Sequence, residues 1–199
     1  MSLISRLRTR LSSGTTPPDS QHALSEAERL LRRGGSVAEI RSLAELAAPS
    51  DIVGRAWQAL FLGDVDQAQH LAYEAADARP YDVDSRIVHG TVRLARNELE
   101  YSDHEFEAVI EEFGAEADAA DGRRAGILAR GFAPLDDIPA SDDDWETAAT
   151  LLTTLWRLCG LVETRVQSLS GAHADGLGVI ERSLNRGMTI DSEADHGSV

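Results

Sequence analysis

The sequence of 199 residues contains no lysine and only one cysteine, Cys159. A single cysteine excludes an internal disulfide, so the fold has to rest on a packed core. No apolar run approaches the ~20 residues that a bilayer span requires, and residues 1–13 lack the continuous apolar stretch of a secretory signal. From these absences we expect a cytoplasmic protein without a membrane span.

The charged residues are strongly unbalanced, with 34 acidic residues against 19 basic ones and a formal net charge of −15. We expect no nucleic-acid partner, because binding phosphates needs a basic face. An acid excess without lysine is similar to the composition of proteins from salt-loving archaea, where salt screens the repulsion between carboxylates. Much of the acidity is therefore interpreted as halophilic adaptation rather than as a binding signal.

Helical periodicity runs through the chain, and no segment alternates polar and apolar residues as a strand would. The all-α prediction is most detailed for residues 56–82, which read as a helix, a tight turn and a second helix. A shift of about 34 residues superimposes this pattern on residues 90–116. The shift aligns Ala56 with Gly90, Gly63 with Asn97, and Ala68 with Ser102. Small residues at these positions would let the two helices of a unit approach closely.

On these residues, the stretch from 49 to 116 resembles two repeats of the tetratricopeptide repeat family. The turn at residues 63–68 and Pro80, which would close the unit, are its strongest part. Ile52 in the first repeat and Arg86 in the second stand where the family has an aromatic residue, and the resemblance is weaker in the second repeat than in the first. The resemblance implies antiparallel helical hairpins stacked as a short array, followed here by a C-terminal helical pair. The alternative is a helical bundle without repeat ancestry.

The flanking segments complete the predicted organisation. Residues 1–20 are expected to form a basic arm and flexible linker, and residues 21–116 the repeats, with a first helix capped by Ser25 and Glu28. A C-terminal helical region is predicted over 117–187, and a disordered acidic tail over 188–199. In the arm, apolar Leu7 and Leu11 are separated from the arginines, which would suit an anionic membrane surface, a partner, or the chain's own acidic body.

The family resemblance also implies a binding surface, because the first helix of each repeat lines a concave groove. We expect this groove to bind a peptide or helix of another protein, with Trp57 as its anchor. The alternative for Trp57 is a place in the core between hairpins. The expected groove residues are Val53, Trp57, Leu60, Phe61, Asp84, Ile87, Thr91 and Leu94.

A second surface is predicted from spacings of three and four residues in the segment 145–169, which is typical of a helix with an apolar seam. We expect this helix to pack in a globular core or to form a homodimer. The expected interface residues are Leu152, Leu155, Cys159, Val162 and Val166.

Motifs for catalysis or cofactor binding do not occur in the chain: it has no nucleophile elbow, phosphate-binding loop or dinucleotide fingerprint. The leading interpretation is therefore a non-enzymatic adaptor or scaffold without catalytic residues, cofactor or metal. One alternative is a helical metal-binding or enzymatic bundle that uses the acids around His104. The other is a structural subunit that dimerises through the helix 145–169.

Overall fold

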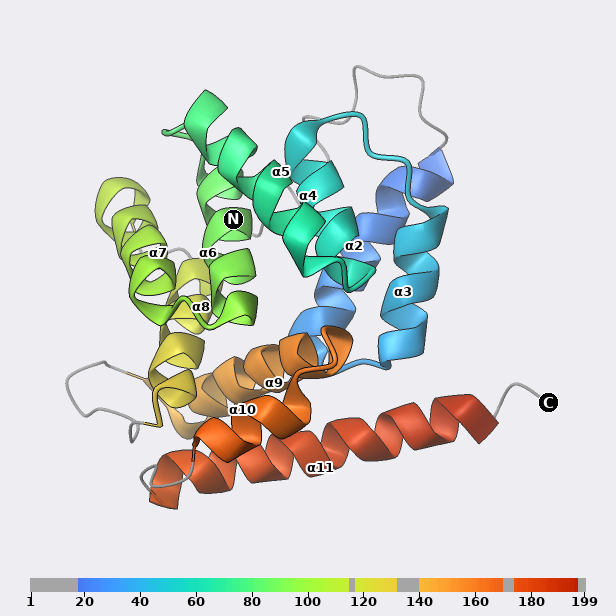
Figure 1. The fold of residues 1–199 in the computed structure, drawn as a ribbon, viewed down its shortest axis with the longest axis vertical. Coiled ribbons are helices and arrows are strands. Elements are labelled where there is room, and N and C mark those ends of the chain that lie inside the picture. The colour runs from blue at the N-terminus through green and yellow to red at the C-terminus, as the bar shows by residue number, and fades with distance from the viewer. Residues whose placement is uncertain (1–17, 115–116, 132–139, 170–173, 197–199) are drawn as a thin grey trace.

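The computed structural model describes residues 18–114, 117–131, 140–169 and 174–196, and every regular element within them is an α-helix. The all-α prediction is confirmed (Figure 1). The helices are α2 (Pro18–Arg33), α3 (Val37–Leu46), α4 (Ile52–Phe61), α5 (Val65–Ala78), α6 (Val83–Arg96), α7 (Leu99–Phe113), α8 (Ala117–Ala129), α9 (Asp142–Leu158), α10 (Val162–Ser168) and α11 (Ala174–His196). None of these described helices combines the length and the apolarity needed to cross a bilayer.

The first six described helices pack in consecutive pairs, α2 with α3, α4 with α5, and α6 with α7. Each pair is joined by a tight turn with a residue at positive φ: Gly34 at 74°, Gly63 at 82° and Asn97 at 65°. Glycine and asparagine tolerate this backbone conformation better than other residues. The Asp64 side chain then accepts a hydrogen bond from the backbone of Gln67 and caps the start of α5.

Phe106 of α7 lies against the backbones of two neighbouring helices. A Cβ atom added at Gly90 of α6 would lie 2.9 Å from the Phe106 ring, and one at Gly122 of α8 would lie 2.3 Å from it. The Ser102 hydroxyl also donates to the carbonyl oxygen of Gly90 at 2.9 Å. The expected close approach at Gly90 and Ser102 is therefore present, and it positions α6, α7 and α8 around one aromatic ring.

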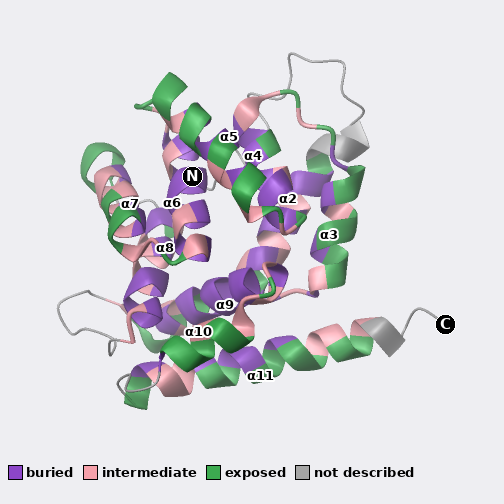
Figure 2. Ribbon diagram, viewed as in Figure 1, coloured by how far each residue is buried: buried purple, intermediate pink, exposed green. Residues whose placement is uncertain are grey.

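Helix α9 is the central element, and Figure 2 shows it buried along most of its length. It packs against α2, α8 and α11 and also contacts α3, α6 and α10. Thr150 and Thr153 are buried in this helix, where each hydroxyl donates to the carbonyl oxygen four residues earlier. These bonds satisfy the polar atoms and allow threonine to occupy an apolar interior.

Helix boundaries differ from the prediction at two places. Helix α2 begins at Pro18, so Ser25 lies inside a helix and does not cap one; proline is favourable in a first helical turn because its missing N–H is not needed there. The predicted continuous helix 145–169 is divided between α9 and α10, with Gly160 at a φ of 66° between them. Ser141 is the N-cap of α9, and Asp144 completes its capping box.

The segment 188–196 is helical, so the prediction of a disordered tail is wrong for these residues. Helix α11 continues through them because Asp191 has partners on two other helices. Residues 1–17 of the predicted arm and residues 197–199 of the predicted tail lie outside the described part of the chain.

Candidate functional site

The eight residues predicted to line a concave groove are all buried by the chain itself. They are Val53, Trp57, Leu60, Phe61, Asp84, Ile87, Thr91 and Leu94. Helix α2 packs against α4, and α9 packs against both α2 and α6, so these helices occupy the side where a partner was expected. Trp57 stacks on Phe61 with 5.4 Å between ring centroids. The prediction of an open groove is wrong here, and the alternative that Trp57 belongs to the core is confirmed.

The residues of the predicted dimer interface lie in different places in the structure. Leu152 and Leu155 of α9 are fully buried within the chain, and Cys159 is half-buried at the C-cap of that helix. Burial raises the pKa of the Cys159 thiol to about 11, against a smaller opposing effect of two arginines. Val162 and Val166 lie on the separate helix α10. These five residues therefore do not form one continuous exposed seam, and Leu152 and Leu155 lie in the globular core that was the other expectation for this helix.

The acidic region around His104 was the predicted site of an alternative metal-binding function. His104 is exposed on α7, and its neighbours Asp103 and Glu107 pair with Arg123 of α8 at 3.1 and 3.0 Å. Within the residues that the structure describes, no group of three His, Cys, Asp or Glu side chains could hold a metal ion. The acids of α7 that were singled out therefore connect two helices.

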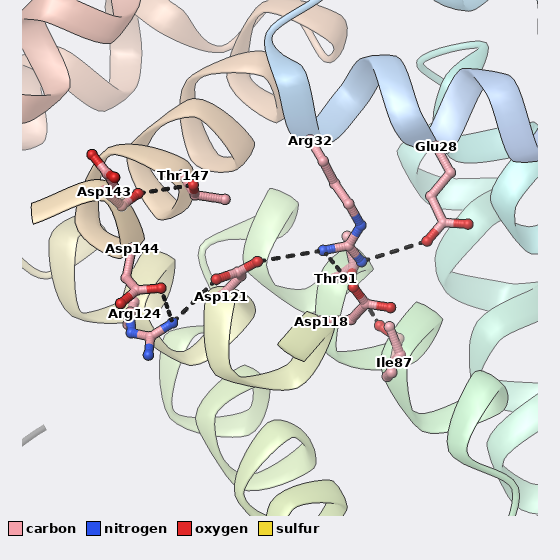
Figure 3. A network of polar contacts seen from close by, with 10 residues as sticks. All are labelled: Glu28, Arg32, Ile87, Thr91, Asp118, Asp121, Arg124, Asp143, Asp144 and Thr147. Atoms are coloured by element: carbon pink, nitrogen blue, oxygen red, sulfur yellow. Dashed lines mark hydrogen bonds and ion pairs between the residues drawn. The ribbon is translucent and has the colours of Figure 1, made fainter. Parts of the chain in front are cut away.

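A mostly buried ionic network joins α2, α8 and α9 (Figure 3). Arg32 of α2 lies 3.5 Å from Glu28 on its own helix and 3.2 Å from Asp118 of α8. Arg124 of α8 then links Asp121, at 3.2 Å, to Asp144 of α9, at 3.9 Å. We call these six residues the ionic network: Glu28, Arg32, Asp118, Asp121, Arg124 and Asp144.

Two carboxyl groups of the ionic network have raised pKa values, and burial is the main cause of both shifts. Burial raises the pKa of Glu28 to about 7; the charge of Arg32 opposes the shift, while Asp118 and Asp84 add to it. Burial also raises the pKa of Asp121, against the opposing charges of Arg32 and Arg124. Shifted carboxyl groups are common at functional sites, but each carboxylate here faces an arginine within the protein. The geometry supports a structural role, in which the network ties three helices together.

The most distinctive surface lies over α6, between α5 and α7. Tyr73 of α5 meets the His89 ring edge-on, with 6.1 Å between centroids. Arg93 of α6 donates through Nε to His89 Nε2 at 2.9 Å and places its guanidinium 4.8 Å from the centre of the Tyr101 ring. On the other side of the imidazole, His89 Nδ1 lies 3.2 Å from Glu105 of α7. We call these five residues the tyrosine seam.

Hydrogen bonding orders the centre of the tyrosine seam. Because His89 Nε2 accepts from Arg93, the ring proton is on Nδ1 and faces Glu105. Burial raises the pKa of Glu105, but the contact with His89 and the charges of Arg86 and Arg93 outweigh it, and the pKa is lowered overall. His89 itself is only 4% exposed. A fixed polar floor therefore supports the two tyrosine rings above it.

Both rings of the tyrosine seam face outward. Tyr73 is 61% exposed and Tyr101 is 63% exposed, while Tyr81, in the turn between α5 and α6, is 78% exposed. These are the only three tyrosines in the chain. Figure 2 shows exposed residues along the outer sides of α5 and α7. The sequence did contain a signal that could have indicated this surface: every tyrosine falls between positions 73 and 101.

Acidic side chains are numerous on the two helices that flank the tyrosine seam. Helices α5 and α7 contain no arginine and nine carboxylates, namely Asp66, Glu74, Asp77, Glu100, Asp103, Glu105, Glu107, Glu111 and Glu112. The positive charge at the seam comes from α6, where Arg93 and Arg96 both pair with Glu98. The seam thus combines exposed aromatic rings with an excess of negative charge.

Comparison with known proteins found no matching family model, no matching curated protein and no matching solved structure. The function is therefore inferred from the geometry described above.

Proposed function

We propose that the protein is a non-enzymatic interaction module of tetratricopeptide-like helical hairpins, and that its binding surface is the tyrosine seam. The observation that carries this proposal is the outward exposure of Tyr73 and Tyr101 above a fixed polar floor. Tyrosine is enriched in protein interfaces because its rigid ring covers a large apolar area while its hydroxyl remains able to hydrogen bond.

The helices that carry the tyrosine seam support binding of a partner rather than catalysis. Tyr73 and Tyr101 project from two helices that flank α6, so their spacing is set by helix packing rather than by a loop. A surface supported in this way loses little conformational entropy when a partner binds. The repeat-like pattern of residues 49–116 also supports an adaptor, although the surface proposed here uses the exposed Tyr73 and Tyr101 rather than the buried Ile87 and Leu94 of α6.

The surroundings of the seam define the chemistry of the partner. Asp66, Asp103, Glu107 and Glu112 already pair with arginines of the chain. The carboxylates of α5 and α7 still outnumber these arginines, which favours a segment with positive charge, and exposed tyrosine rings favour guanidinium groups, which stack on aromatic faces. The expected partner is a peptide or helix of another protein that carries arginine beside apolar residues.

The test begins with proteins captured by the full chain from an extract of the organism that encodes it, at the salt concentration of that organism. Each captured protein is identified by mass spectrometry, and its affinity is then measured with purified components. We expect the variant Tyr73→Ala/Tyr101→Ala to weaken binding on the order of thirtyfold, which corresponds to about 2 kcal/mol.

The matched control is Leu46→Ala, because Leu46 is 70% exposed on the distant helix α3. This control should bind as the parent does. If the double tyrosine variant keeps its helical circular dichroism and also keeps full affinity for every identified partner, the tyrosine seam is not the binding surface.

A further inference from the structure

Charge is distributed very unevenly between the first 17 residues and the remainder of the chain. Residues 1–17 contain Arg6, Arg8 and Arg10 and no acidic residue, whereas residues 18–199 contain all 34 acids and 16 of the 19 arginines. The same short stretch contains the apolar residues Leu3, Ile4, Leu7 and Leu11. We call residues 1–17 the basic arm; it has the composition expected above for a partner of the tyrosine seam.

The tyrosine seam already contains one contact of the required kind. The Arg93 guanidinium lies over the Tyr101 ring at 4.8 Å, which is within the range of a cation–π interaction. Tyr73 and Tyr101 themselves remain largely exposed, on helices that also carry carboxylates such as Glu74 and Glu100. An arginine from outside the described residues could therefore stack on a ring and pair with a carboxylate in the same place.

The length of the basic arm allows it to reach this surface within one molecule. Seventeen residues span up to about 56 Å when extended, whereas a folded domain of this size has a radius of gyration of about 16 Å. A tethered segment also has an effective concentration on the order of millimolar. At such a concentration, a contact too weak to hold two separate molecules together is strong enough to form within one chain.

We propose that residues 3–11 of the basic arm dock on the tyrosine seam of the same molecule. The arginines of the arm stack on Tyr73 and Tyr101 and pair with the carboxylates of α5 and α7, while its leucines cover the ring edges. The docked arm then competes with an arginine-bearing partner for the same rings. The competition rests on the function proposed above, whereas the docking itself does not.

The docking is tested with the full chain carrying Ser5→Cys and Cys159→Ser, with a nitroxide attached to the new cysteine. We expect the nitroxide to broaden the backbone amide NMR signals of α5 and α7 around Tyr73 and Tyr101, relative to the same sample after reduction. Replacing the three arginines of the arm with glutamine should abolish this broadening. Raising the salt concentration from 0.1 M to 1 M should weaken it, because the screening length falls from about 10 Å to about 3 Å.

A mixed sample distinguishes docking within one molecule from docking between two. Spin-labelled chains without ¹⁵N are combined with ¹⁵N-labelled chains that carry no nitroxide, and we expect no broadening. Broadening in this mixture would identify a second copy as the occupant and overturn the proposal. The proposal is also overturned if the signals around Tyr73 and Tyr101 keep their intensity, or if the broadening falls on another face such as α11.

The proposed function is tested by a separate measurement, the affinity of an identified partner. If the arm covers the seam nine-tenths of the time, the triple arginine-to-glutamine variant should bind that partner about tenfold more tightly. Absence of arm docking together with loss of partner binding in Tyr73→Ala/Tyr101→Ala would overturn the docking and leave the proposed function standing. Arm docking together with full partner binding in that double variant would leave the docking standing and overturn the proposed function.

Discussion

Arg157 and Asp191 form a two-point ion pair, in which Arg157 Nε donates to one carboxylate oxygen and Nη2 to the other, each at 2.9 Å. Arg157 is almost completely buried on α9, and its Nη2 also donates to the carbonyl oxygen of Gly35. Asp191 of α11 in turn accepts a hydrogen bond from the backbone of Val37, the first residue of α3. One ion pair therefore joins three helices that are distant in sequence and stabilises the start of α3.

We expect Asp191→Asn to lower the free energy of unfolding by roughly 3 kcal/mol, because it leaves the buried guanidinium of Arg157 without a counter-charge. Truncation after Met188 should cost at least as much. Urea denaturation measures both effects, and Glu193→Gln, an exposed position on the same helix, is the control. A change of less than about 0.5 kcal/mol for Asp191→Asn would show that the ion pair does not hold α11 in place.

A second prediction compares two glycines of α8. Gly122→Ala places a Cβ atom 2.3 Å from the Phe106 ring, whereas a Cβ atom at Gly126 would have no neighbour within 4 Å. We expect Gly122→Ala to cost about 1–3 kcal/mol through overpacking. Gly126→Ala should be neutral or stabilising by up to about 1 kcal/mol, because alanine favours the helix.

Thermal unfolding of both glycine variants measures the difference. Combining Gly122→Ala with Phe106→Leu should cost less than the sum of the two single changes, since the smaller side chain relieves the clash. Equal stability of Gly122→Ala and Gly126→Ala would contradict the packing around Phe106.

Glu28 should make stability depend on pH. Its pKa in the folded protein is about 7, above the ordinary value of 4.5, so the folded state favours the protonated form. This contribution is fully present below pH 4.5 and is lost as the pH rises through 7. We expect Glu28→Gln, which resembles the protonated form, to be more stable than the parent at pH 8, by on the order of 2–3 kcal/mol.

The advantage of Glu28→Gln should shrink toward zero near pH 4.5. Unfolding in urea at a series of pH values measures it, and Glu45→Gln, exposed on α3, serves as the control. A difference between Glu28→Gln and the parent that stays constant from pH 4.5 to pH 8 would disprove the proposed titration.

Salt should stabilise the whole fold, because the formal net charge is −15 and repulsion between surface carboxylates is less screened in dilute salt. We expect the melting temperature and the helical circular dichroism to rise between ~0.1 M and molar salt. Values that remain the same across this range would argue against halophilic adaptation.

The turns were predictable because their chemistry is local. Gly63 followed by Asp64 specifies a positive φ and then a helix cap within two positions, and both occur in the structure. Asn97 likewise marks the end of α6. The predicted cap at Ser25 was wrong because a cap is needed only where a helix begins, and α2 begins seven residues earlier, at Pro18.

The binding surface was not predictable in the same way, because coverage of a helix face depends on distant segments. Trp57 and Ile87 are apolar in the sequence whether a partner or the chain itself covers them. Here α2 and α9 pack on that side, and α9 begins 85 residues after Trp57. The helical state of residues 188–196 had a similar cause, since Asp191 finds its partner on α9 rather than within its own segment.

The central position of α9 has a consequence for synthesis on the ribosome. Leu31 of α2 and Leu152 of α9 belong to the same buried core, yet 121 residues separate them. At roughly 5–20 residues per second, the nascent chain exposes α2 for on the order of ten seconds before α9 has been translated. During that interval the early hairpins lack the helix that completes their interior, so the nascent chain presents apolar surface to chaperones until most of its length has been made.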